Sequence, residues 1–221
     1  MGRKKVAVIL SGCGNKDGSE VQESVLALYF LDKHDLKYQC YAPDAPQTEV
    51  VDFMSNNKLH ETRNQLKEAA RIARSDIRPL SHLNPDTYDA LLIPGGGGSN
   101  LKNLSNYIYD QDNPQATDEV NRVIRGFYNA GKPIGAICAA SVLTAVALKD
   151  VTKGFLTLAT GTNYLAQFTD KIDRKTIPST EIVVDTDNKI VSTPAYINDA
   201  TITEVGTGIE KLVIQIGKWV S

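Results

Sequence analysis

Short apolar runs alternate with longer amphipathic segments along the whole chain. The runs have the length and composition of buried strands, and they lie at 6–10, 38–42, 90–94, 133–138, 181–185 and 189–193. Segments with apolar residues at helical spacing stand between most of them, at 19–34, 62–74, 116–131, 139–148 and 198–220. Strands that alternate with helices of this length indicate βαβ units. The pattern therefore predicts an α/β fold with a mostly parallel sheet and helices on both of its faces.

Two turn signals refine this prediction. Asp187-Asn188 separates the last two apolar runs and predicts a tight hairpin, so the sheet should contain an antiparallel element late in the chain. Asn56-Asn57 predicts a second, smaller hairpin before the second helix. No repeat, low-complexity tract or linker interrupts the pattern, and residues 1–221 are therefore predicted to form a single domain.

Composition and charge narrow the function classes. The 221 residues carry a formal net charge of -2, with Lys and Arg spread along the chain, which argues against a nucleic-acid-binding surface. No apolar run approaches the ~20 residues that span a bilayer, so no membrane association is expected. The three cysteines, Cys13, Cys40 and Cys138, include no CxxC pair and predict neither a disulfide framework nor a zinc site. We expect a reducing, cytoplasmic location.

Cys138 stands at the junction of a predicted strand and a predicted helix, in the stretch KPIGAICAASVL at 132–143. A strand that turns sharply into a helix, with small residues around the turn, is typical of a nucleophile elbow. At the helix N-terminus the helix dipole would lower the pKa of a thiol below its free value of ~8.5. The alternative is a passive core cysteine, since free Cys is often a small buried residue. The residues alone leave both interpretations open.

Two further features follow predicted strands and belong at the same edge of the sheet. Four glycines at 95–98 favour a backbone that approaches a substrate closely and offers bare N–H groups, as an oxyanion hole does. The loop SGCGNKDGSE at 11–20 lacks the GxGxxG and GxxxxGK[ST] spacings of nucleotide sites. It leads into Glu20 and Glu23. Glu20 fits a helix-start acid beside a Ser19 N-cap, whereas Glu23 adjoins an apolar face that would raise the pKa of its carboxyl.

Five separated segments, taken together and in order, resemble one known family. They are VAVILSGCGNKDGSEVQESV, HETRNQLKEAARIAR, LLIPGGGGSNLKNLS, KPIGAICAAS and IVVDTDNKIVSTPAY. They resemble the ES1/ElbB group (isoprenoid-biosynthesis-associated, sigma cross-reacting proteins) of the DJ-1/PfpI superfamily of class I glutamine-amidotransferase-like proteins. The resemblance covers essentially the whole chain. It implies a flavodoxin-like three-layer sandwich that forms a homodimer.

The resemblance also implies roles for individual residues. Cys138 matches the reactive elbow cysteine, and Glu23 matches the glutamate of the first helix that hydrogen-bonds it, with Glu20 as the competing candidate. Gly96 and Gly97 match the oxyanion loop, and the backbone N–H of Ala139 would complete the hole.

The chain departs from the protease-like and amidotransferase members in its histidines. The position after the cysteine is Ala139, where many protease-like members have histidine, and the only histidines are His34, His60 and His82. A Cys-His-acid triad is therefore not expected, and peptidase or glutaminase activity is doubtful. His60, in the inserted segment, is either a surface histidine or a residue that approaches the site.

Three functions fit these residues. The leading hypothesis is a glutathione-independent glyoxalase. It converts glyoxal or methylglyoxal, small reactive dicarbonyls, to the 2-hydroxy acid through a hemithioacetal on Cys138 and needs no metal or organic cofactor. The second is a redox sensor in which Cys138 is oxidised, with Cys13 as either a resolving thiol or a passive buried residue. The third is a module that binds a partner or metabolite without catalysis. Fold alone does not decide among them.

Overall fold

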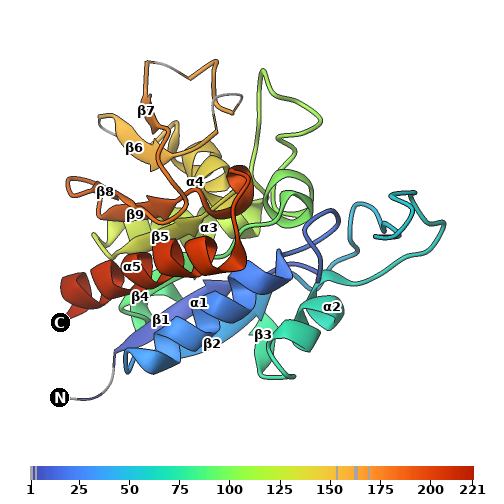
Figure 1. Cartoon of the computed structure of the whole chain (residues 1–221), viewed down its shortest axis with the longest axis horizontal. Coiled ribbons are helices and arrows are strands. Elements are labelled where there is room, and N and C mark those ends of the chain that lie inside the picture. Colours follow the sequence, from blue (N-terminus) through green and yellow to red (C-terminus); the bar gives the residue numbers. More distant parts are fainter. Residues whose placement is uncertain (1, 3, 153, 162–163, 169) are drawn as a thin grey trace.

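A seven-stranded sheet forms the centre of the protein, and a separate pair of strands lies beside it (Figure 1). The structure, a computed structural model, describes the whole chain except residues 1, 3, 153, 162–163 and 169. Within the described residues, the order of the large sheet is β3-β2-β1-β4-β5-β9-β8. The strands are β1 (Lys5–Ile9), β2 (Lys37–Ala42), β3 (Ile77–Pro79), β4 (Ala90–Ile93), β5 (Ile134–Ile137), β6 (Leu156–Ala159), β7 (Ile172–Lys175), β8 (Val183–Asp185) and β9 (Ile190–Thr193).

Helices cover both faces of the sheet, as the sequence pattern predicts. They are α1 (Val21–Lys33), α2 (Gln65–Ile72), α3 (Asp118–Asn129), α4 (Ala140–Leu148) and α5 (Ile202–Val220). Buried residues of α1, α2 and α5 form one apolar core with the sheet, and those of α3 and α4 form a second core on the opposite face. Figure 1 shows α1 and α5 side by side over the first face. The flavodoxin-like, three-layer expectation is confirmed.

The central strands are buried on both faces, which explains their unbroken apolar sequences. All of β4 and β5 is buried, and so is β1 after its first residue. Val8 of β1 lies opposite Cys40 of β2 and Leu92 of β4, and both pairings are parallel. The carboxyl ends of β1, β4 and β5 therefore meet at one edge of the sheet, where ligand sites of such folds lie.

Both predicted hairpins are present. β8 pairs with β9 in antiparallel register, with Val184 opposite Val191, and this is the late antiparallel element. Around the second turn signal, Val51 and Lys58 form an isolated antiparallel bridge, and Asn56 has a φ of 62°. This smaller hairpin projects as an arm between β2 and α2 (Figure 1).

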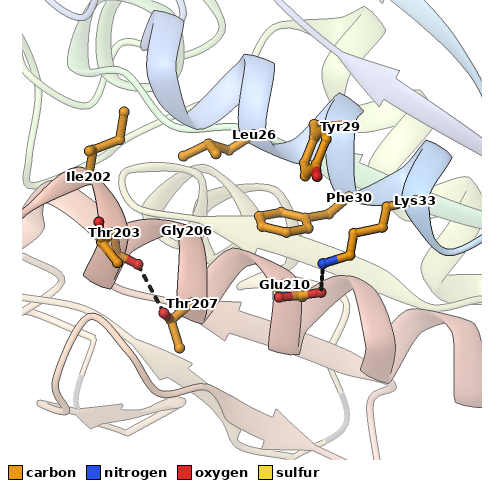
Figure 2. Close-up of a pocket in the computed structure, with 9 residues that line it drawn as sticks. All are labelled: Leu26, Tyr29, Phe30, Lys33, Ile202, Thr203, Gly206, Thr207 and Glu210. Carbon is orange, nitrogen blue, oxygen red and sulfur yellow. Dashed lines mark hydrogen bonds and ion pairs between the residues drawn. The ribbon is translucent and has the colours of Figure 1, made fainter.

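The packing of α1 on α5 leaves a groove between their exposed sides (Figure 2). At one end Lys33 forms an ion pair with Glu210, with 2.9 Å between Nζ and Oε1. The His34 ring also lies 3.0 Å from the same carboxylate oxygen. His34 therefore has a structural partner on α5.

No described helix is both long and apolar enough to cross a membrane.

Candidate active site

Cys138 lies between β5 and α4, at the carboxyl edge of the sheet. Its backbone φ angle is +56°, in the left-handed region that residues other than glycine rarely adopt. The strained turn is held from both sides: Cys138 N–H donates to the Thr193 carbonyl at 2.9 Å, and Ser141 N–H donates to the Cys138 carbonyl at 3.1 Å. This is the geometry of a nucleophile elbow, with a side chain that is only partly covered.

Glu23, in the first turn of α1, is fully buried beside Cys138. Its Oε1 accepts the Tyr196 N–H at 3.3 Å. Its Oε2 forms no hydrogen bond of regular geometry in the described part of the chain, although the Cys138 side chain and the Gly95 N–H both lie close to the carboxyl. Burial, together with the nearby charge of Glu20, raises the pKa of Glu23 to about 8. The carboxyl is therefore mostly protonated at neutral pH, as its apolar surroundings in the sequence indicated.

The pKa of Cys138 moves in the direction opposite to the one predicted. Burial raises the pKa of the thiol above its ordinary value, and the charge that Glu23 carries when ionised raises it further. The N–H groups of Ala139 and Gly96 act in the other direction, because they donate toward the sulfur and favour the thiolate. The helix start does contribute a favourable donor, but desolvation outweighs it. At neutral pH the two acids therefore form a mostly protonated pair.

The glycine run supplies the opposite wall of the site. A Cβ at Gly95 would overlap both the Glu23 Oε2 and the Cys138 Cβ, so only glycine fits between them. Gly96 has a φ of +112°, and a Cβ there would overlap the Gly18 carbonyl. The N–H of Gly97 has no hydrogen bond within the described residues, and Gly97 is half-exposed. This N–H is available to a bound oxyanion.

Glu20 has a structural task. It is the N-cap of α1, and its carboxylate accepts the Glu23 N–H at 2.6 Å. The predicted Ser19 N-cap is wrong, because the Ser19 Oγ instead accepts the buried Ser11 N–H at 2.9 Å. Of the two candidate glutamates, Glu23 is the one whose carboxyl reaches Cys138.

Cys13 and His60 lie outside this pair. Cys13 is a half-buried free thiol whose pKa is raised by burial and by the charge of Glu68 on α2. His60 is exposed on the arm, and no hydrogen bond joins it to the Cys138–Glu23 pair in the described structure. No group of three or more His, Cys, Asp or Glu side chains in the described residues could hold a metal ion.

Two residues at the site were missed by the sequence analysis. They are Tyr164, whose pKa is raised by burial and by its nearness to Cys138, and Tyr196. Gly95 was part of the predicted glycine loop, but its place between Glu23 and Cys138 was not predicted. Tyr196 belongs to a short turn, Ala195–Ile197, and its hydroxyl donates to Gln22. The sequence held a signal for it, since Tyr196 lies three residues after the end of β9, at the same edge as Cys138.

Relatives with known names support the resemblance seen in the sequence. The chain is 36% identical to human glutamine amidotransferase-like class 1 domain-containing protein 3, mitochondrial, over 96% of this chain and 82% of that protein. It is also 36% identical to the rat ES1 protein homolog, mitochondrial, over 97% of this chain and 83% of that protein. The crystal structure of an isoprenoid biosynthesis protein with an amidotransferase-like domain from Ehrlichia chaffeensis superimposes with a TM-score of 0.89, at 35% identity, over 97% of this chain and 99% of that one.

These names correct one prediction. Both mammalian relatives are mitochondrial proteins, which contradicts the cytoplasmic location expected here. The expectation rested on the absence of a disulfide framework, and that absence separates reducing from oxidising surroundings without choosing among reducing compartments.

The family assignment rests on two independent matches. The model of the DJ-1/PfpI family matches residues 71–200, more than half of the chain, and that segment contains the glycine run and the Cys138 elbow. The relatives extend the similarity to nearly the full length, and they include the ES1 proteins named above. The protein therefore belongs to the DJ-1/PfpI family and is related within it to the ES1 proteins.

Proposed function

We propose that the protein is a cofactor-independent glyoxalase that converts glyoxal to glycolate. The observation that carries this proposal is the buried Glu23 carboxyl, with its raised pKa, beside the elbow thiol of Cys138. A thiol and a protonated carboxyl that share one site can add to an aldehyde and then move protons between adjacent carbons. Two N–H groups already face the sulfur, so charge that develops near it meets preorganised donors.

The reaction begins when the pair loses one proton. Glu23 has the lower pKa of the two groups, so its carboxyl is ionised in the singly protonated state. The carboxylate accepts the proton of the thiol as the sulfur attacks one carbonyl carbon of glyoxal and a C–S bond forms. The same proton then passes from Glu23 to the developing alkoxide and gives a hemithioacetal. The unpaired N–H of Gly97 and the N–H groups of Gly96 and Ala139 stabilise the oxyanion while it exists.

The second half of the reaction uses Glu23 as a base. Its carboxylate removes the proton from the carbon that carries sulfur, and an enediol forms. Return of a proton to the neighbouring carbon gives a thioester of glycolic acid. Water then cleaves the thioester, which releases glycolate and restores the thiol. Glyoxal plus water thus becomes glycolic acid with no external oxidant, because one carbon is oxidised while the other is reduced.

The histidines give no support to the peptidase-like alternative. His34 is paired with Glu210. His60 and His82 are exposed, and no hydrogen bond joins either ring to Cys138 among the described residues. A Cys-His hydrolase needs an imidazole within hydrogen-bond reach of the thiol. We therefore favour aldehyde chemistry over amide hydrolysis.

Glycolate formation from glyoxal in the absence of glutathione tests the proposal. Wild type, Cys138→Ala and Glu23→Gln are compared, with Cys13→Ser as the matched cysteine control. Turnover lost in the first two variants and kept in the control would support the glyoxalase. Wild type without turnover above buffer would reject it.

A second candidate, redox sensing, is favoured by the partial exposure of Cys138 and by the two N–H groups that would hold sulfinate oxygens, whereas the raised pKa of the thiol works against its oxidation. Two equivalents of hydrogen peroxide would convert the thiol to the sulfinate and release two waters. Sulfinate formation on Cys138 without glyoxal turnover would favour this function. The homodimer implied by the family stays a prediction, which sedimentation velocity tests.

A further inference from the structure

Asn100 is fully buried beneath the glycine loop, in the single helical turn η3 (Gly98–Asn103). Its side-chain Nδ2 donates to the Pro94 carbonyl and to the Gly96 carbonyl, both at 3.1 Å. Its backbone N–H donates to the same Gly96 carbonyl at 2.9 Å. One residue therefore holds two peptide groups of the loop that faces Cys138.

These hydrogen bonds fix the directions of the N–H groups in the same peptides. In a trans peptide the C=O and the N–H point to opposite sides. Because the Pro94 carbonyl is held toward Asn100, the Gly95 N–H faces the Glu23 carboxyl. Because the Gly96 carbonyl is held, the Gly97 N–H is directed away from Asn100 and stays unpaired within the described residues.

The peptide between these two is held from a different element. The Gly95 carbonyl accepts the Glu20 N–H at 3.0 Å, at the start of α1. The Gly96 N–H is thereby turned toward the Cys138 sulfur. Two successive N–H groups thus serve the carboxyl and the sulfur, and the third, that of Gly97, is unpaired within the described residues. Asn100 directs the first and the third.

We propose that Asn100 is a positioning residue, which orients the Gly95 and Gly97 N–H groups for the carboxyl of Glu23 and for the substrate oxyanion. The inference rests on the proposed function for its substrate. Its effect on the Cys138–Glu23 pair can be measured without any turnover.

A merely structural role would give a different signature. The Asn100 Oδ1 is buried and has no partner within the described residues, so the carboxamide is retained at a cost and only its donors are used. Loss of a structural asparagine would lower stability and leave the pKa of the pair unchanged. The other titratable groups that face the pair are Glu20 at the start of α1, Tyr164 after β6 and Tyr196 after β9. None of these three residues is substituted in the variants.

The experiment uses Asn100→Leu, which keeps a similar shape and removes the donors without adding a charge, and Asn100→Ser, whose hydroxyl has a shorter reach. Asn121→Leu is the matched control, because Asn121 also donates to one carbonyl, that of Ala116, and also has a buried, unpartnered Oδ1. The first readout is the rate of Cys138 alkylation by iodoacetamide against pH, measured on the peptide that contains Cys138. The second is kcat and KM for glyoxal.

We expect the alkylation midpoint of both Asn100 variants to move to higher pH, since lost donors leave the anions less stabilised. Alkylation at pH 7.5 should fall roughly 3- to 10-fold, which corresponds to a midpoint shift of about 0.5 to 1 unit. For glyoxal, kcat should fall more than KM rises.

Folded Asn100 variants with the wild-type midpoint would overturn the proposal, and so would an equal shift in the Asn121 control. If neither Asn100 variant folds, hydrogen exchange of the Asn100 side-chain amide in wild type decides, with slow exchange supporting the two bonds and fast exchange excluding them. A wild type that is alkylated as expected but converts no glyoxal would reject the glyoxalase, and the alkylation readout would still test Asn100.

Discussion

The Glu23 carboxyl and the Cys138 side chain meet across Gly95, at the face of that residue where a side chain would stand. A Cβ at Gly95 would overlap both partners. The closeness of acid and thiol therefore depends on a third position that supplies no chemistry of its own. The raised pKa of Glu23 is a consequence, because a carboxyl sealed between a helix, an elbow and a glycine loop has lost its water.

Gly95→Ala tests this arrangement directly. The added methyl must displace the carboxyl or the elbow, so we expect glyoxal turnover to fall at least 100-fold and stability to fall by about 1–3 kcal/mol. Glycolate assays and urea unfolding measure the two effects. Gly217→Ala is the control, since a Cβ there meets nothing within 4 Å in α5, and it should raise stability by about 0.4–1 kcal/mol. A Gly95→Ala protein with wild-type turnover would contradict the steric overlap that the structure gives for a Cβ at this position.

Glu23→Gln should change how stability depends on pH. The pKa of Glu23 is raised from 4.5 to about 8 on folding, so between these values the folded state holds a proton that the unfolded state has lost. This group therefore lowers stability as pH rises through the window, by roughly 3–5 kcal/mol in total. Glutamine has no such proton. Urea unfolding at pH 5 and pH 8.5 should show that the free energy of unfolding of Glu23→Gln, relative to that of wild type, is higher at pH 8.5 than at pH 5. If the difference in unfolding free energy between the two proteins were the same at both pH values, the raised pKa would be contradicted.

The reactivity of Cys138 should depend on pH through the ionisation of Glu23. The pair loses its first proton near pH 8, so wild-type alkylation and glyoxal turnover should both rise through about pH 8. Glu23→Gln should remove this inflection, because the variant has only one titrating group at the site. Rates of iodoacetamide modification from pH 6 to pH 10 provide the measurement. A midpoint well below neutrality in wild type would mean that the helix start and the two N–H donors outweigh burial.

Much of the fold could be predicted because apolar runs report burial. The runs at 6–10, 90–94 and 133–138 became the central strands β1, β4 and β5. Three strands were missed. β3 has only three residues, of which one is proline and none is fully buried, and β7 is IDRK, with one buried residue. The third, β6, pairs with β7 apart from the main sheet. Such strands are defined by their neighbours more than by their own composition.

Some residues of the site and part of its electrostatics could be predicted, including the raised pKa of Glu23. The elbow and the acidic helix start were visible as Cys138 and Glu23, since both depend on local sequence. The roles of Gly95 and Asn100 were not visible, because the direction of a peptide N–H depends on which group holds its carbonyl. The pKa of Cys138 was predicted in the wrong direction, since a sequence shows the helix start but not how closely three segments enclose the sulfur.

The most direct test of the central claim follows the adduct on Cys138. Wild type, Glu23→Gln and Cys138→Ala are mixed with glyoxal, quenched at short times and analysed by intact mass and peptide mapping. If Cys138 attacks and Glu23 moves the protons, Glu23→Gln should retain one glyoxal on the Cys138 peptide and release no glycolate, wild type should release glycolate, and Cys138→Ala should do neither. Glycolate release by Glu23→Gln at the wild-type rate, or equal glyoxal adducts on Cys138→Ala, would contradict the account.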